Sequence, residues 1–173
     1  MVSTKVSNNE KTGVLLISHG SRLPESIKTI NKLADMFRKQ TNFKVNVAYM
    51  ELREPNIPTA LDDLVKNTKI DTVIAVPVFL SPGMHTTRDI PKILGLANDN
   101  SHEDDHGSDN HKHSHGHAHN HENSHNHGHD HHHKVEKINF EGKIIYTEPL
   151  GADPLLVEII KKRVDTALND WKN

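Results

Sequence analysis

The chain contains no cysteine in 173 residues, which excludes disulfide bonds, zinc ribbons, iron–sulfur clusters and thiol nucleophiles. It also lacks a long hydrophobic run near its start, where the apolar residues 14–17 follow a polar stretch. We therefore expect neither a signal peptide nor a membrane span, and a cytoplasmic location. Hydrophobic residues make up only 34% of the chain and aromatic residues 4%, which is low for a packed domain.

The hydrophobic deficit is confined to one stretch. Between residues 98 and 134 the only hydrophobic residue is Ala118, and removing these 37 of the 173 residues leaves 136, enough for one domain with a core. The same stretch holds seven acidic residues and two lysines, so the remainder has 19 basic and 16 acidic residues. This weak excess does not indicate a nucleic-acid partner, although it suits an anionic small molecule.

Histidine is concentrated in the same stretch. Fourteen of the 16 histidines lie between His102 and His133, most densely from His111 to His133. This composition predicts a disordered loop, because almost nothing apolar offsets the entropy of ordering it. Such a run can bind several exchangeable nickel, cobalt, zinc or copper ions. Three roles stay open for it: a metal buffer, a dispensable spacer or, in a storage protein, the main functional element.

Outside the insert, strand-length apolar runs alternate with helical periodicity. Strands are expected at 13–18, 43–49, 71–79 (ending near Pro77) and 142–147, and helices at 25–39, 56–67 and about 86–96. Asp153 as N-cap and Pro154 at the first turn open a last helix, whose apolar stripe runs to Trp171. The pattern predicts an α/β fold: a small doubly wound, four-stranded parallel sheet with flanking helices. We expect a polar tail at 1–12 and a single domain at 13–173, interrupted by the insert at 98–134.

The two histidines outside the insert follow the first and third predicted strands. In a doubly wound sheet, ligands bind beyond the carboxyl ends of the strands, here loops 18–24, 50–56, 80–86 and 147–153. His19 lies in the first of these loops and His85 in the third, while Glu51 and Glu54 lie in the second. Two imidazoles and a carboxylate suit a borderline divalent ion such as cobalt, nickel or zinc.

Other interpretations of these residues stay open. A histidine at a strand end is often a hydrogen-bonded loop residue, and Glu54 can simply be solvated. The stretch "HGS" resembles a loose phosphate-binding turn but lacks G-x-G-x-x-G and the P-loop lysine. Ser18, His19 and Ser21 do not form a G-x-S-x-G elbow, which argues against a hydrolase. Gly20 and Gly83 would allow a ligand to approach the backbone closely.

Four segments together resemble the small class II chelatases that insert cobalt or nickel into sirohydrochlorin: "LLISHGSRLPES", "MELREPNIP", "VPVFLSPGMHTTRDIPKILGL" and "EPLGADPLLVEII". The resemblance runs from about Val14 to the last helix. It implies that His19 is a metal ligand and the proton acceptor, and that His85 is a second catalytic metal ligand. It also implies that substrate is bound by Glu54 and by the segment Leu80, Ser81, Pro82, Gly83 and Met84.

The resemblance further implies the reaction and its partners. Sirohydrochlorin and nickel(II) or cobalt(II) would be the substrates, with no prosthetic group and no membrane partner. Arg22, Arg53 and Arg88 could pair with the carboxylates of the macrocycle or remain solvated. Longer class II chelatases contain two such halves in one chain, so this single half implies a homodimer. Iron or precorrin-2 remains a rival substrate, whereas the histidine run favours nickel and the nickel tetrapyrrole coenzyme of methanogens over cobalamin.

Overall fold

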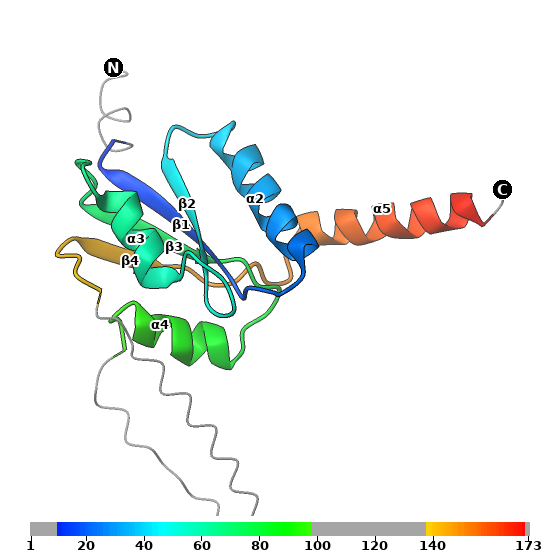
Figure 1. The fold of residues 1–173 in the computed structure, drawn as a ribbon. Coiled ribbons are helices and arrows are strands. Elements are labelled where there is room, and N and C mark those ends of the chain that lie inside the picture. Colours follow the sequence, from blue (N-terminus) through cyan, green and yellow to red (C-terminus); the bar gives the residue numbers. More distant parts are fainter. Residues whose placement is uncertain (1–9, 98–137, 172–173) are drawn as a thin grey trace, which may run out of the picture. The chain divides into compact units, whose positions relative to one another are not determined.

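The computed structural model describes residues 10–97 and 138–171 (Figure 1). These residues form a parallel sheet of four strands in the order β2-β1-β3-β4. The strands are β1 (Thr12–Ser18), β2 (Lys44–Tyr49), β3 (Thr72–Pro77) and β4 (Lys143–Tyr146). The predicted fold class is confirmed, and the first and third strands are direct neighbours at the centre of the sheet. The predicted insert at 98–134 and residues 1–9 of the predicted tail lie outside the described residues.

Each helix begins where the sequence supplies a suitable first turn. Proline occupies the first turn of α2, α3, α4 and α5. In α2, α3 and α5, which begin new helices, the missing N–H costs no hydrogen bond. The side chain of Asn56 caps α3 by accepting from the Thr59 amide at 2.9 Å, and Asp153 caps α5 as predicted. The helices are α2 (Pro24–Arg38), α3 (Ile57–Val65), the π-helix η1 (His85–Asp89), α4 (Ile90–Ile93) and α5 (Pro154–Asp170).

The core lies on both faces of the sheet because side chains alternate along each strand. On one face, α3 and α4 pack against the central strands, in a cluster of Leu15, Ile17, Ala48, Ile57, Ala60, Leu61, Leu64, Val73, Ala75, Ile90 and Leu94. On the other face, α2 places Ile30 and Ala34 against Val47 and Tyr49. This packing fixes the carboxyl ends of β1, β2 and β3 side by side.

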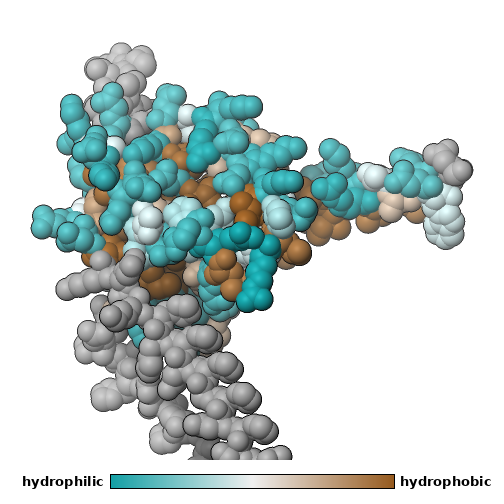
Figure 2. Space-filling view, in the orientation of Figure 1, coloured by the Kyte–Doolittle hydropathy of each residue, from teal (hydrophilic) through white to brown (hydrophobic). Residues whose placement is uncertain are grey.

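Helix α5 differs from the other long helices because none of its residues is buried. In Figure 2, hydrophobic side chains line one side of this helix, which leads away from the sheet in Figure 1. The exposed apolar residues of α5 and its end are Leu155, Val157, Ile159, Ile160, Val164, Leu168 and Trp171. The predicted apolar stripe is therefore present, but it covers no sheet face in this chain. Ile145 of β4 also remains 39% exposed.

The predicted helix at about 86–96 is only partly regular, which corrects the expectation of a plain α-helix. It starts as the π-helix η1, and α4 adds a single short turn. Among the described residues, no helix is both long and apolar enough to cross a lipid bilayer.

Candidate active site

The loops after β1 and β2 are joined through their backbones. The amide of Met50 donates to the Ser18 carbonyl at 2.9 Å, and that of Glu51 donates to the His19 carbonyl at 3.0 Å. Gly20 adopts φ +94°, and a Cβ there would collide with the Glu51 carbonyl oxygen. Gly20 is thus required by a close approach of the chain to itself, which fixes the backbone beside His19.

The Arg53 side chain also joins the loop after β2 to the loop after β1. Its Nε donates to the Ser21 carbonyl at 2.8 Å, and its Nη2 donates to the Arg22 carbonyl at 2.7 Å. The sequence suggested a substrate carboxylate or solvent as the partner of Arg53. Instead, the planar guanidinium binds two backbone oxygens and clamps the loop that carries His19.

The turn that leads into His85 is held by two threonines. The Gly83 carbonyl accepts hydrogen bonds from the amides of Thr86 and Thr87 at 3.0 and 2.9 Å, and Thr87 Oγ1 donates to it at 2.9 Å. The Thr86 hydroxyl, on a residue that is only 4% exposed, accepts from the Gly83 amide at 2.9 Å. Nothing lies within 4 Å of a Cβ built at Gly83, so this glycine has open space on that side.

The π-helical turn explains an unexpected role for Tyr146. The amide of Ile90 donates to the His85 carbonyl, so the next residue would have to donate to the Thr86 carbonyl. That residue is Pro91, which has no N–H. The Tyr146 hydroxyl donates to the Thr86 carbonyl instead, at 2.8 Å. Burial, with a further contribution from the charge of Glu148, raises the pKa of Tyr146 to about 12.

The sequence analysis missed Tyr146. Pro91 lies five residues after Thr86 and cannot donate to its carbonyl, which indicates that some other donor is needed. The sequence does not identify that donor, because Tyr146 lies 60 residues further along the chain.

The fold brings His19 and His85 together as predicted. Their ring centroids are 5.1 Å apart, with the ring planes 78° from parallel, and the His19 ring also lies 6.3 Å from that of Phe79. His19 Nδ1 lies 3.2 Å from the Gly20 carbonyl oxygen, and His85 Nδ1 lies 2.8 Å from Oδ2 of Asp89. Both acceptors lack a proton, so each Nδ1 is the donor, and in the neutral form of each ring the lone pair is on Nε2.

Asp89 is bound from two sides. Besides the His85 contact, its Oδ1 accepts from Arg88 Nε at 2.8 Å. Partial burial raises the pKa of Asp89, but the hydrogen bonds and charges of Arg88 and His85 outweigh it, so the pKa lies below its ordinary value. Asp89 is therefore a carboxylate throughout the neutral range.

Glu54 is exposed and held by the chain that follows it. The Asn56 amide donates to Glu54 Oε2 at 2.6 Å, and Asn56 Nδ2 donates to Oε1 at 3.3 Å. Each carboxylate oxygen keeps a lone pair for a further contact. Within residues 10–97 and 138–171, no three His, Cys, Asp or Glu side chains are grouped to hold a metal ion. The structure thus pairs the two histidines, but neither Glu51 nor Glu54 joins them as a third ligand.

Part of the predicted substrate segment lines a cavity of about 500 Å³. Leu80, Ser81 and Pro82 form one wall, and the opposite wall is the start of α5 with Leu156, Val157 and Ile160, so the lining is largely apolar. The adjacent Gly83 and Met84 are exposed, Met84 by 60%. The segment is therefore accessible from outside the core.

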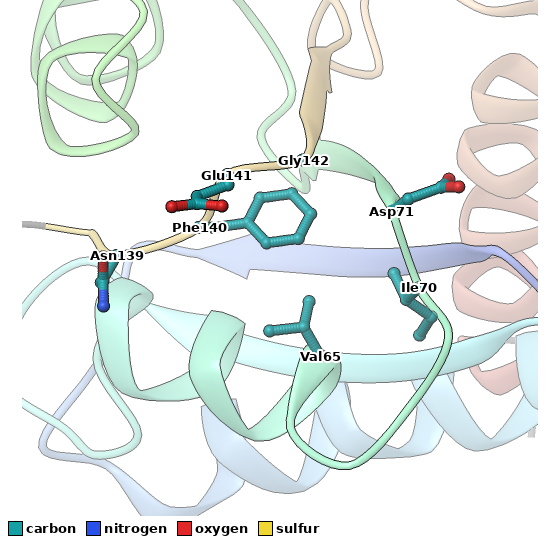
Figure 3. A pocket seen from close by; sticks show the side chains of 7 residues that line it. All are labelled: Val65, Ile70, Asp71, Asn139, Phe140, Glu141 and Gly142. Carbon is teal, nitrogen blue, oxygen red and sulfur yellow. The ribbon is translucent and has the colours of Figure 1, made fainter.

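A second cavity, of about 530 Å³, lies at the amino ends of β3 and β4 and is shown in Figure 3. Phe140 points into it toward Val65, whereas Asp71 turns away. Its lining residues are Val65, Ile70, Asp71, Asn139, Phe140, Glu141 and Gly142, without a histidine. It is at the opposite end of the strands from the histidine pair and plays no part in the site.

The chain is similar in sequence to known proteins over most of its length. A sirohydrochlorin cobaltochelatase from Methanothermobacter thermautotrophicus is 45% identical over 158 residues, covering 91% of this chain and 94% of that protein. Another from Methanocaldococcus jannaschii is 49% identical over 151 residues, covering 87% of this chain and 95% of that protein.

Structural and family comparisons agree with these relatives. The crystal structure of a cobalamin (vitamin B12) biosynthesis CbiX protein from Marinobacter aquaeolei VT8 superposes with a TM-score of 0.60 at 22% identity, covering 94% of this chain and 98% of that one, which supports the fold. The sequence model of the CbiX family matches residues 13–167. The chain belongs to the CbiX family.

Proposed function

We propose that this protein is a sirohydrochlorin chelatase that inserts cobalt(II) or nickel(II) into the macrocycle. The observation that carries the proposal is the pair of imidazoles, His19 and His85, whose rings lie 5.1 Å apart at the carboxyl ends of neighbouring strands. Relatives named sirohydrochlorin cobaltochelatase cover nearly the whole chain, which supports the same activity here.

The reaction requires a metal to be released and protons to be accepted. As the divalent ion enters, the macrocycle loses two pyrrole N–H protons, and the ion exchanges protein ligands for ring nitrogens. A neutral imidazole nitrogen can bind the metal or accept a proton, but one lone pair cannot do both at once. Two imidazoles that each present Nε2 let one hold the metal while the other takes the first proton. The imidazole that releases the metal can then take the second proton.

A pair of imidazoles also suits a metal that must leave. Structural metal sites close the coordination shell with four protein ligands, whereas open sites leave positions for other molecules. With two histidines from one chain, the remaining positions are open to water and then to the nitrogens of the macrocycle. The ion is a substrate here and is not retained.

The macrocycle would lie against the exposed apolar segment at Leu80 and Met84, with Glu54 contacting a pyrrole N–H. Arg53 and Arg88 already bind groups of the protein. The Arg22 guanidinium forms no ion pair within the part of the chain that the structure describes, and it lies in the loop after His19. Arg22 is therefore the best placed of the three arginines to bind a substrate carboxylate.

We also propose a homodimer in which α5 of each chain packs on the other. Support comes from the exposed apolar stripe of α5 and from Ile145, which lies on the sheet face covered elsewhere by α2 and is 39% exposed. Exposed apolar stripes of this length are unusual in monomers.

Light scattering should give twice the chain mass for the native protein and one chain mass for Ile160→Asp. Lys162→Asp, on the polar side of α5, is the control, and a monomeric native protein would contradict this assembly.

The metal preference is tested by competition between nickel(II), cobalt(II) and iron(II) at equal free concentrations.

The histidine run from His111 to His133 lies outside the described residues. Its composition favours an accessory role for the run, in supplying nickel or cobalt to the enzyme. It also keeps a metal-storage protein as the second candidate function. Deleting residues 101–133 distinguishes them: a chelatase keeps its rate at saturating metal and slows when metal is scarce, whereas a storage protein loses only bound metal.

The decisive assay follows the visible spectrum of sirohydrochlorin with cobalt(II) under anaerobic conditions. We expect His19→Ala and His85→Ala each to slow insertion about 10²-fold or more, since proton acceptance alone contributes at least that factor. His111→Ala removes one histidine of the run and should keep the native rate at saturating metal. Native rates in both variants of the pair would refute the proposed site.

A further inference from the structure

The carboxylate next to His85 binds only side chains of its own helical turn. Asp89 lies where η1 runs into α4, and it makes no capping hydrogen bond. Its two oxygens bind His85 Nδ1 and Arg88 Nε, both at 2.8 Å. The side chains of His85 and Asp89 are 41% and 29% exposed, so the pair is partly shielded from water.

We propose that Asp89 is a positioning residue that fixes the tautomer and direction of the His85 ring for metal insertion. This inference rests on the proposed function of His85. A carboxylate can only accept, so the proton of a neutral His85 ring must be on Nδ1 and the free lone pair must be on Nε2. Because Arg88 holds the other oxygen, the carboxylate cannot rotate away from the imidazole without breaking a second hydrogen bond.

The two histidines differ in how they are held. His19 Nδ1 faces a neutral carbonyl, that of Gly20, at 3.2 Å, whereas His85 Nδ1 faces a charged carboxylate at 2.8 Å. Hydrogen bonds to charged acceptors are shorter and stronger, and a carboxylate behind an imidazole makes it a better metal ligand. The asymmetry makes His85 the more firmly oriented of the two imidazoles.

The π-helical turn contributes to this arrangement. The aspartate lies four residues after the histidine, and the turn between them is fixed at one end by the Thr86 and Thr87 contacts to Gly83. Tyr146 secures the same turn from β4. The histidine and its carboxylate therefore lie on one short turn that is hydrogen-bonded both at Gly83 and to Tyr146.

The test compares Asp89→Asn and Asp89→Ala with the native full-length protein. Asparagine keeps the shape and can still accept through Oδ1, but it lacks the charge and can also present its NH₂ group to the ring. We expect both variants to raise the KM for cobalt(II) about 10- to 100-fold, as is usual for loss of such a partner, with a smaller change in kcat. Asp62→Ala, an exposed aspartate on α3, is the control and should leave both constants unchanged.

A second readout does not depend on turnover. Long-range proton–nitrogen NMR reports which ring nitrogen of a histidine carries the proton, and the His85 signals are those lost in His85→Gln. We expect the Nδ1–H form in the native protein and a mixture of forms in Asp89→Ala.

The inference is overturned if Asp89→Asn and Asp89→Ala keep both the native KM for cobalt(II) and the native tautomer. If the native protein and His85→Ala insert metal equally fast, the proposed role of His85 in insertion fails instead. The NMR experiment then still decides whether Asp89 sets the ring.

Discussion

Replacing Gly20 with alanine tests how the backbone beside His19 is held. The substitution adds one methyl group at a residue with φ +94°, where the Cβ would overlap the carbonyl oxygen of Glu51. To relieve the overlap, the loop after β1 and the loop after β2 must separate. That movement strains the hydrogen bonds from Met50 to Ser18 and from Glu51 to His19.

The magnitude follows from two contributions. Placing an L side chain at a left-handed φ costs about 1–2 kcal/mol, and forcing packed atoms apart costs about 1–3 kcal/mol more. Gly20→Ala should therefore lower the free energy of unfolding by about 2–5 kcal/mol, a large share of the roughly 5–15 kcal/mol typical of a domain. A displacement of His19 by about 1 Å should also slow metal insertion about 10²-fold.

Urea unfolding followed by far-ultraviolet circular dichroism measures the stability change. Trp171 is 86% exposed at the end of α5, so its fluorescence is a poor reporter of the core. Gly83→Ala is the matched control, because this glycine precedes the other histidine but a Cβ added to it would meet nothing within 4 Å. A loss below about 1 kcal/mol for Gly20→Ala, or a loss equal to that of Gly83→Ala, would refute the reasoning.

Three further substitutions test the elements around the histidine pair. Tyr146→Phe leaves the Thr86 carbonyl without its donor and should cost about 1–3 kcal/mol in urea unfolding. Burial raises the pKa of Tyr146 from 10 to about 12, so its contribution to the free energy of unfolding is complete below pH 10 and is lost as the pH rises through 12. The phenolate absorbance of Tyr146 should appear near pH 12 and be absent in the variant. Asn56→Ala removes the α3 cap and should cost about 1 kcal/mol. It also removes the Nδ2 hydrogen bond to Glu54 Oε1 but keeps the backbone one, so the KM for sirohydrochlorin should rise if the Nδ2 contact helps to hold that carboxylate. Arg53→Lys cannot reproduce the two-carbonyl clamp and should cost about 1 kcal/mol, with native stability arguing against the clamp.

The sequence alone predicted most of the elements and the edge of the sheet where the two histidines meet. Continuous apolar runs such as residues 13–18 are buried strands, and apolar residues at helical spacing predicted α2, α3 and α5, because periodicity is a local property of the chain. His19 and His85 were placed at one edge of the sheet by a general rule for parallel strands. The ring distance of 5.1 Å agrees with that rule.

Only the tertiary structure decided how the site is held. Tyr146 meets the Thr86 carbonyl across 60 residues, and Arg53 reaches the loop of His19 across about 30, because the strand order brings those segments together. The Asp89 contact to His85 spans four residues and lies in a π-helical turn, where the sequence predicted an ordinary helix. The apolar stripe of α5 was readable in the sequence, but periodicity shows only that a stripe exists. Which surface covers that stripe is a long-range property, and in this chain its own sheet does not.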